Sequence, residues 1–240
     1  MNTMRIEQHT HPVFGVPQSS SSRLGELHAL IAKYDVLQQR ILQQRSFIVL
    51  EVGSYEGSSA IALSSCIAEL GARGHITCVD PWLPYLPEED IATNDVCSRM
   101  QQDLQSGITY ARFIHNIKFA HPNVPISHFR GTLHEMLHVT ADPGTFDLIY
   151  IDGSHVYKDV KRDLDNAWPL LNVGGIMCGD DLEHQFTAHE ERVVVVADRE
   201  YVDGYHPGVT LAVGRRFGYV WSRGGVWAVK KTGESSWEQP

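Results

Sequence analysis

Short apolar runs alternate with stretches of helical periodicity along most of the chain. Strand–helix alternation of this kind predicts a parallel sheet with right-handed crossovers and helices on both faces. The apolar runs are too short for buried helices and predict strands. The five strands expected are residues 47–50, 75–79, 126–129, 146–151 and 175–178.

Helical spacing fills the intervals between several of these runs. Apolar positions recur three or four residues apart over 58–70 and 156–171, and a further helix is expected near 94–118. Ser58 can cap the first of these helices, and Gly174-Gly175 can stop the second.

The chain before the first strand divides into two parts. Residues 1–22 contain two prolines and the serine run 19–22, a composition typical of a mobile tail or a loosely docked arm. Residues 23–44 carry an apolar stripe at helical spacing, which predicts one amphipathic helix. That stripe can pack on the core, or it can form a lid or a subunit contact.

Two further segments complete the predicted domain, which spans 23–240 with 23–45 as an accessory helix. The connection 81–123 is too long for a plain link and is interpreted as a lid-like insert. Residues 217–222 and 226–230 flank a turn at 223–225, which predicts an antiparallel hairpin at the end of the sheet.

Composition narrows the range of partners. The 240 residues include 42% hydrophobic and 20% charged positions, as in ordinary globular proteins. Twenty Lys and Arg against 29 Asp and Glu give a net charge of −9, which argues against nucleic acid or an anionic membrane as partner.

Targeting signals and cysteine pairs are not found in the sequence. No apolar run reaches the length of a membrane span, and residues 1–22 lack the pattern of a secretory signal. The four cysteines form no CxxC pair, so zinc is not expected, and a reducing cytoplasm is the simplest location.

Each of the five predicted strands is followed by polar or acidic residues. Asp, Ser and Gly favour turns and helix caps, so any one of these segments alone has a purely structural explanation. All five together, at the carboxyl edge of one parallel sheet, predict a ligand site. The segments are Glu51–Gly57, Asp80, Arg130–Thr132, Asp152–His155 and Asp180-Asp181.

The first of these loops favours a cationic ligand over a pyrophosphate. Gly53 and Gly57 are four residues apart, so the dinucleotide fingerprint GxGxxG is absent, although both glycines would let a ligand approach the backbone. Glu51 suits an ammonium group, and Asp80 after the next strand can accept hydrogen bonds from both hydroxyls of a ribose. A ligand with an amino-acid end and a ribose end is S-adenosylmethionine.

A second constellation is a trio of aspartates, Asp152, Asp180 and Asp181. Three carboxylates that converge need a cation, and an oxygen-only ligand set favours a hard ion such as Mg²⁺. Alternatively, Asp152 caps the helix at 156 and Asp181 caps a turn. His155 lies at the mouth of the same crevice, where it is either a general base or a contact to ligand or solvent.

These motifs resemble the class I S-adenosylmethionine-dependent methyltransferases. The resemblance rests on EVGSYEGSSA at 51–60, on Asp80 and on DLIYIDGSHVYKDVKRDLDNAWPLLNVGGIMCGDD at 147–181. Within that class the chain looks like the small-molecule O-methyltransferases that include the macrocin and mycinamicin sugar methyltransferases. The similarity covers about 47–182, and 206–213 is similar to a later HPGV segment of the group.

The resemblance implies a Rossmann-like, doubly wound α/β fold with a mostly parallel seven-stranded sheet and a reversed last strand. It implies that the Gly131-Thr132 turn lies near the adenine of the cofactor and that Asp80 holds the ribose. It also implies that Asp152, Asp180 and Asp181 are ligands of a divalent metal. The methionine end of the cofactor would be held by Glu51, Gly53, Ser54, Gly57 and Ser59.

The expected reaction is methyl transfer from S-adenosylmethionine to a hydroxyl of a sugar or natural-product diol, with Mg²⁺ aiding ionisation and His155 or Asp152 taking the proton. The related catechol-type enzymes have Asp-Asn where this chain has Asp180-Asp181, so a catechol acceptor is disfavoured.

Two alternatives to a methyltransferase stay open: a nicotinamide-dependent oxidoreductase, and a non-catalytic binding protein that retains the fold. The helix expected at 23–44 makes a homo-oligomer plausible.

Overall fold

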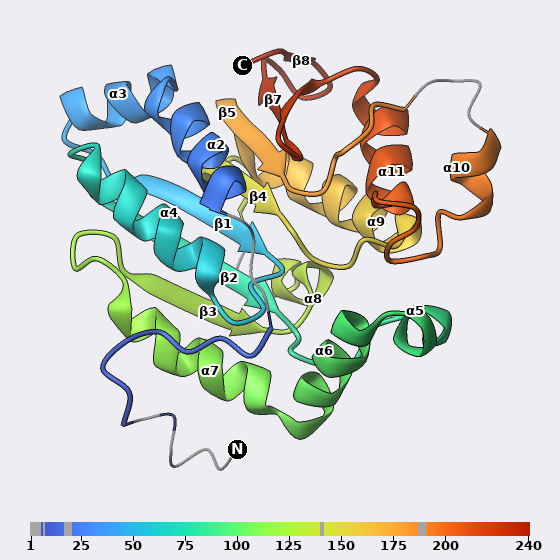
Figure 1. Cartoon of the computed structure of the whole chain (residues 1–240). Coiled ribbons are helices and arrows are strands. Elements are labelled where there is room, and N and C mark those ends of the chain that lie inside the picture. Colours follow the sequence, from blue (N-terminus) through green and yellow to red (C-terminus); the bar gives the residue numbers. More distant parts are fainter. Residues whose placement is uncertain (1–5, 7, 17–20, 140–141, 187–190) are drawn as a thin grey trace.

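The computed structural model describes residues 6, 8–16, 21–139, 142–186 and 191–240. Their strands form one sheet in the order β3-β2-β1-β4-β5-β7-β6, with β8 paired to β7 (Figure 1). Strands β1 to β5 pair with one another in parallel, whereas β7 is antiparallel to β5, β6 and β8. The strands are β1 Phe47–Val52, β2 Gly74–Asp80, β3 Ile126–Arg130, β4 Phe146–Ile151, β5 Leu171–Gly179, β6 Trp221–Arg223, β7 Val226–Lys231 and β8 Trp237–Glu238.

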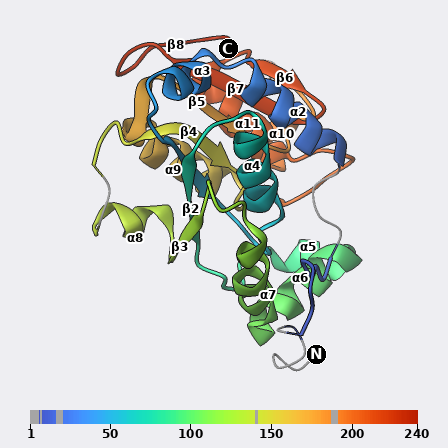
Figure 2. The same cartoon turned by 90° about the vertical axis from the view of Figure 1, so that its left-hand side faces the viewer.

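Helices cover both faces of this sheet. Helices α2, α4 and α7 lie over one face, and α8, α9 and α11 lie over the other (Figures 1 and 2). The helices are α2 Ser21–Ala32, α3 Asp35–Leu42, α4 Ser58–Glu69, α5 Glu88–Thr93, α6 Asp95–Ser106, α7 Ile108–Asn116, α8 Leu133–Leu137, α9 Tyr157–Ala167, α10 Glu191–Val195 and α11 Pro207–Phe217. The Rossmann-like, doubly wound fold is therefore confirmed, with the short β8 as an additional edge strand.

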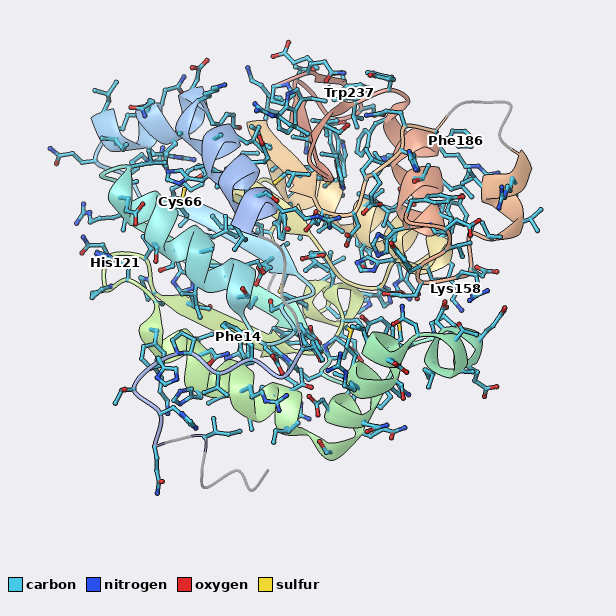
Figure 3. All side chains as sticks on the ribbon, viewed as in Figure 1. Phe14, Cys66, His121, Lys158, Phe186 and Trp237 are labelled. Carbon is cyan, nitrogen blue, oxygen red and sulfur yellow. The ribbon has the colours of Figure 1, made fainter. Side chains whose placement is uncertain are left out.

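The central strands are buried on both sides, and their side chains alternate between two cores (all side chains are drawn in Figure 3). Leu50 and Ile149 pack in the core under α8, α9 and α11, whereas Val49 and Leu148 pack in the core under α2 and α4. Successive residues of a strand point to opposite faces, so a sheet covered on both faces requires continuous apolar runs. The apolar runs in the sequence therefore identified these strands.

The amphipathic segment before β1 is two helices and not the single helix predicted over 23–44. The chain turns at Tyr34, whose backbone is extended and whose hydroxyl donates a hydrogen bond to the carbonyl of Gly174. Leu27, Ile31 and Leu37 are buried, so the apolar stripe packs on the core of its own chain.

Two helix boundaries differ from the sequence-based expectation. Gly57, with φ +84°, is the N-cap of α4, and Ser58 is the first helical residue. Helix α9 ends at Ala167, because Pro169 lies in the short 3₁₀ turn that follows and cannot donate a backbone hydrogen bond. Strand β5 begins directly after this turn, so Gly174-Gly175 lies inside the strand.

The insert after β2 is divided into three helices. The single helix expected near 94–118 is interrupted at Gly107, which has φ +73° and separates α6 from α7, and α5 precedes them. The C-terminal hairpin is shorter than expected, because Phe217 ends α11 and β6 begins only at Trp221. Within the described residues, every helix is too short or too polar to cross a membrane.

A buried ion pair ties α3 to the central strands. Asp147 at the start of β4 is fully buried and accepts hydrogen bonds from Arg40 Nη2 at 2.6 Å and Nε at 3.2 Å. The backbone N–H of Ile48 and the side-chain amide of Asn172 supply the remaining donors, at 3.0 and 2.9 Å.

We predict that Arg40→Ala lowers the free energy of unfolding by about 3 kcal/mol, because it leaves a buried carboxylate without its counter-charge. Urea denaturation measures this loss. Lys161→Ala is the matched control, because its pair with Asp165 is exposed and should contribute less than about 1 kcal/mol. Equal losses of unfolding free energy in the two variants would show that the buried Arg40–Asp147 pair stabilises the fold no more than an exposed pair does.

Candidate active site

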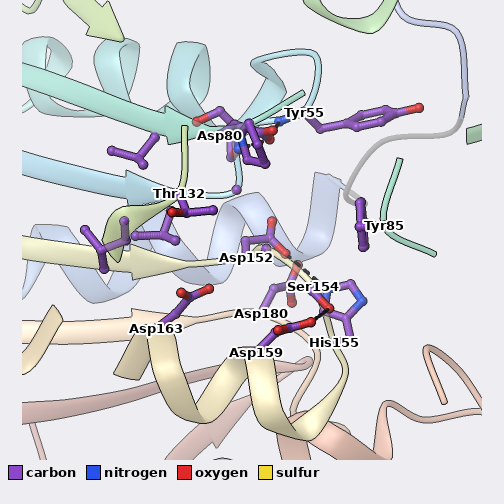
Figure 4. Close-up of a pocket in the computed structure, with 18 of the residues that line it drawn as sticks. Tyr55, Asp80, Tyr85, Thr132, Asp152, Ser154, His155, Asp159, Asp163 and Asp180 are labelled. Atoms are coloured by element: carbon purple, nitrogen blue, oxygen red, sulfur yellow. Dashed lines mark hydrogen bonds and ion pairs between the residues drawn. The ribbon is translucent and has the colours of Figure 1, made fainter. Parts of the chain in front are cut away.

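A cavity of about 500 Å³ opens at the carboxyl ends of the parallel strands (Figure 4). All the strand ends singled out in the sequence contribute to its wall, together with Tyr85, Met100 and Leu104 of the insert. Two predicted site residues, Glu51 and Gly57, are not among the lining residues. Those that line it are Gly53, Ser54, Ser59, Asp80, Gly131, Thr132, Asp152, His155, Asp180 and Asp181.

Glu51 is fully buried at the end of β1. Its Oε2 accepts hydrogen bonds from Ser54 Oγ at 2.6 Å and from Cys78 Sγ at 3.2 Å, whereas its Oε1 has no partner among the described residues. Burial raises the pKa of Glu51 to about 7. A cationic group beside Oε1 would satisfy this atom and favour the ionised carboxylate.

The two glycines of the first loop are required by the protein's own packing. Gly53 has φ +84°, and a Cβ there would lie 2.2 Å from the carbonyl oxygen of Asp152. Gly57 also has φ +84°, and a Cβ there would lie 3.2 Å from the Phe113 ring. The structure thus gives a different reason for these glycines from the close approach of a ligand that the sequence suggested.

Asp80 organises the loop that it faces. Its Oδ2 accepts hydrogen bonds from the backbone N–H groups of Ser54 at 3.0 Å and Tyr55 at 2.9 Å, and its Oδ1 accepts one from Trp82 at 2.6 Å. Burial raises the pKa of Asp80 from its ordinary value. The carboxylate lines the cavity while it holds the β1 loop against the end of β2.

Thr132 both lines the cavity and starts α8. Its Oγ1 accepts a hydrogen bond from the N–H of Glu135 at 3.2 Å, and the Glu135 carboxylate accepts one from the N–H of Thr132 at 2.7 Å. This reciprocal pair is a capping box. It fixes the Gly131-Thr132 turn at the cavity wall.

The three aspartates meet as the sequence predicted. Asp152, Asp180 and Asp181 each bring a carboxylate oxygen within 4.8 Å of the others. The alternative for Asp152 is wrong, because α9 begins after Val156 without a side-chain cap. Asp181 has φ +67°, a conformation that costs free energy for a non-glycine residue and here turns its carboxylate toward the other two.

Arg23 of α2 enters this acidic cluster, and sequence reasoning missed it. Its Nη1 lies 2.9 Å from Asp180 Oδ1 and also contacts Asp181, and its Nη2 donates to Glu183 Oε1 at 2.8 Å. No local motif marks Arg23 in the sequence, since it is one arginine on a helix far from the strand ends. The guanidinium supplies part of the positive charge that converging carboxylates need.

The two neighbouring aspartates respond to this environment in opposite ways. Burial and the charges of Asp152 and Asp181 raise the pKa of Asp180 to about 7. Burial also acts to raise the pKa of Asp181, but His155, His206 and Arg23 outweigh it and hold that pKa below its ordinary value. The cluster therefore keeps Asp181 ionised, and Asp180 is protonated more easily than Asp181.

His155 lies between carboxylates on both sides of its ring. Its Nδ1 is 2.7 Å from Glu200 Oε1, and its Nε2 is 2.9 Å from Asp181 Oδ2 and 3.7 Å from Asp152 Oδ1. Burial lowers the pKa of His155, but Glu200 and Asp181 raise it well above its ordinary value. The imidazole is therefore protonated in this arrangement and must lose a proton before it can act as a base.

Glu200 is a second residue that sequence reasoning missed. It is buried, and its backbone N–H donates to Asp90 Oδ2 at 2.9 Å. Arg199 also pairs with Asp90, with Nη2 3.0 Å from Oδ1. Because Asp90 belongs to α5, these contacts connect the insert to the carboxylate beside His155.

The described part of the N-terminal segment is a docked arm. Val13 exchanges hydrogen bonds with the side chain of Asn116, and the N–H of Gly15 donates to Glu56 Oε2 at 2.7 Å. Val16 is buried and lines the cavity. The expectation of a docked arm applies to residues 8–16, while residues 1–5, 7 and 17–20 lie outside the described structure.

Comparison with known proteins gives a family match over the same residues. A family model described as a methyltransferase domain matches residues 50–182, more than half of the chain. This range includes both the β1 loop and the three aspartates. A comparison with curated proteins finds no match.

Solved structures with similar folds include three O-methyltransferases. NovP is 15% identical, with 85% of this chain and 79% of that chain covered and a TM-score of 0.48. The O-methyltransferase from Bacillus cereus in complex with SAH is 16% identical, with 95% and 87% covered and a TM-score of 0.45. TomG from Streptomyces achromogenes, in complex with SAM, is 16% identical, with 89% and 82% covered and a TM-score of 0.45.

We predict that the pKa of Glu51 makes stability depend on pH. The folded protein holds a proton on Glu51 up to about pH 7, whereas the carboxyl of the unfolded chain loses it near its ordinary pKa of 4.5. The free energy of unfolding should therefore fall as pH rises from 5 to 8, by roughly 2–3 kcal/mol more in the native protein than in Glu51→Gln. Urea denaturation at both pH values measures the difference.

Glu69→Gln, at an exposed position, is the control and should follow the native pH dependence. If Glu51→Gln also follows the native curve, the carboxyl of Glu51 ionises normally, and its burial does not account for the pH dependence.

Proposed function

Because the chain belongs to the methyltransferase-domain family and is a class I S-adenosylmethionine-dependent methyltransferase, we propose that it methylates a hydroxyl oxygen of a small molecule with the help of a divalent cation. The observation that carries this proposal is that Asp80 and the three aspartates line one cavity, while Glu51 is buried beneath the β1 loop that forms part of its wall. Glu51 and Asp80 suit the cofactor, and the three aspartates suit a cation beside it.

The β1 loop fits the methionine end of the cofactor. The unpartnered Oε1 of Glu51 is a buried acceptor that an ammonium group would satisfy. Ser54 holds the other oxygen of the same carboxylate, and Gly53 and Ser59 line the cavity nearby. Gly57 would act through the shape of the loop, because it does not reach the cavity.

The ribose and adenine would follow along the carboxyl edge of the sheet. Asp80 keeps lone pairs for the ribose hydroxyls beyond those used by three backbone N–H groups, since a carboxylate offers about four acceptor sites. The turn at Gly131 and Thr132 would lie beside the adenine.

Asp152, Asp180 and Asp181 are suited to hold a hard divalent cation such as Mg²⁺. They offer only oxygen atoms, these atoms lie within 4.8 Å of one another, and they already attract the guanidinium of Arg23. When bound, such a cation lowers the pKa of a substrate hydroxyl and helps to orient it. Arg23 competes for the same carboxylate oxygens.

The proton from the hydroxyl would pass to His155 or to Asp152. The contact of Glu200 with Nδ1 presents Nε2 of His155 to the carboxylates and the cavity. His155 can accept a proton there only after it has lost its own. Asp152 also lines the cavity, so both residues are candidates for the base.

The wall of the cavity suits a mid-sized acceptor with adjacent hydroxyls. Tyr85, Met100 and Leu104 of the insert supply apolar and aromatic surface, and the arm adds Val16. Exclusion of water would favour a reaction that neutralises the sulfonium charge. The resemblance to the macrocin and mycinamicin group supports a sugar or natural-product diol as acceptor.

We predict that the protein binds S-adenosylhomocysteine in a one-to-one complex and does not bind NAD, because the β1 loop lacks a pyrophosphate cradle and places Glu51 there. Isothermal titration tests both ligands. Glu51→Gln should weaken S-adenosylhomocysteine binding about tenfold or more through loss of a charged acceptor, while Glu69→Gln should not. Binding of NAD alone would favour an oxidoreductase, and cofactor binding without turnover on a panel of hydroxylated acceptors would favour a non-catalytic protein.

We also predict opposite effects of two substitutions on metal affinity, measured with Mn²⁺ by electron paramagnetic resonance. Asp180→Asn removes a ligand charge and should weaken binding by about 100-fold or more. Arg23→Gln removes the competing cation and should strengthen binding about tenfold. Affinity for S-adenosylhomocysteine should stay within a few fold in both variants. Unchanged Mn²⁺ binding in Asp180→Asn would place the cation elsewhere, and turnover that resists chelators would remove its role.

A further inference from the structure

Asp163 of α9 is a nine-tenths buried carboxylate to which no group of the described residues donates a hydrogen bond within 3.5 Å. Its nearest charged neighbour is Arg162, whose Nε lies 3.7 Å from Oδ1, beyond hydrogen-bond distance. Asp159, one turn earlier, differs in this respect, because it accepts from Ser154 Oγ at 3.2 Å and pairs with Arg162 Nη1 at 3.1 Å. A buried acceptor without a donor is costly and therefore points to a missing partner.

A ligand in the cavity can supply this donor. Asp163 is one of the lining residues, and its Oδ2 lies 3.6 Å from the point where a Cβ on residue 153 would be. Because residue 153 is glycine, the loop after β4 places no side chain beside the Asp163 carboxylate at this point. Asp163 is thus both buried and part of the cavity lining.

Asp163 and His155 lie on different sides of the cavity as it is viewed in Figure 4. In Figure 4, Asp163 and Thr132 are on one side, and Tyr85 and His155 are on the other, with Asp152 between them. Leu133 and Val79 add apolar surface to the lining. The apolar walls suit the flat faces of a purine ring, and the unpartnered acceptor on Asp163 suits a donor on the polar edge of that ring.

We propose that Asp163 recognises the adenine of the cofactor by accepting a hydrogen bond from its exocyclic amine. This inference rests on the proposed function, since it takes the nucleoside of S-adenosylmethionine as the ligand. With the methionine end at Glu51, the ribose at Asp80 and the methyl group toward the three aspartates, the base lies at the remaining end, beside Thr132. Asp163 then selects an adenine nucleoside over purines that lack the amine.

The electrostatics of Asp163 agree with this role. Burial raises the pKa of Asp163 to about 7, and the charge of Arg162 offsets this effect only in part. Both forms of the carboxyl can accept from an amine, and the protonated form can also donate to the adjacent ring nitrogen. Recognition of the amine therefore holds on both sides of neutral pH.

The test is isothermal titration with S-adenosylhomocysteine and with its analogue in which hydrogen replaces the adenine amine. We expect the native protein to bind S-adenosylhomocysteine about tenfold or more tightly than the analogue. Asp163→Leu should bind the two ligands equally, through weaker binding of S-adenosylhomocysteine. Asp163→Asn should keep the preference, because its amide oxygen still accepts from the amine. Asp165→Leu, on the same helix but outside the cavity lining, is the matched control and should also keep it.

The outcomes separate this inference from the proposed function. If the native protein binds neither ligand, the cofactor assignment falls, and the role of Asp163 falls with it. If the native protein prefers the amine and Asp163→Leu shows the same preference, the role of Asp163 alone is overturned. Removal of an unpartnered buried carboxyl should not unfold the protein, and Asp163→Ala provides the same comparison with a smaller side chain.

Discussion

The constraint on which this structure depends is the convergence of acidic side chains at the carboxyl edge of a parallel sheet. Asp152, Asp180 and Asp181 come from neighbouring strands, and Glu183 and Glu200 lie close by. Like charges this close destabilise a fold unless cations balance them. Arg23 and His155 supply positive charge within the chain, and the His206 ring lies 3.3 Å from Asp181. The cluster still carries more acids than these groups neutralise. The same imbalance that costs stability suits the site to hold a divalent cation.

Segments outside the core of the fold provide this balance. Helix α2 brings Arg23 to the aspartates, the chain after α10 brings Glu200 to His155, and α5 of the insert holds Glu200 through Asp90. The docked arm places Val16 at the same cavity. Assembly of the site therefore requires the accessory segments as well as the sheet. Helices α2 and α3 pack into the core of the same chain through residues such as Leu27 and Leu37.

The fold was largely predictable because its signals are local. Apolar runs marked the buried strands, and acids or glycines followed each of them at the edge where ligands bind. The errors also have local causes that the apolar pattern does not report. Tyr34 divides the first amphipathic segment, Gly107 divides the insert, and Pro169 ends α9 before the glycine pair. In each case the backbone preference of one residue, or its distant contact, overrode the periodicity.

The sequence by itself determined the buried strands, their mostly parallel sheet and the polar residues that follow each strand, because these follow from periodicity and from residues adjacent in the chain. Only the tertiary structure decided what those acids face. Arg23 meets Asp181 across 158 residues, Glu200 meets His155 across 45, and Asp163 is left without a donor behind Gly153. Whether two charged groups pair depends on their distance in space. Spacing along the chain does not predict that distance when the two residues lie on elements so far apart in the sequence.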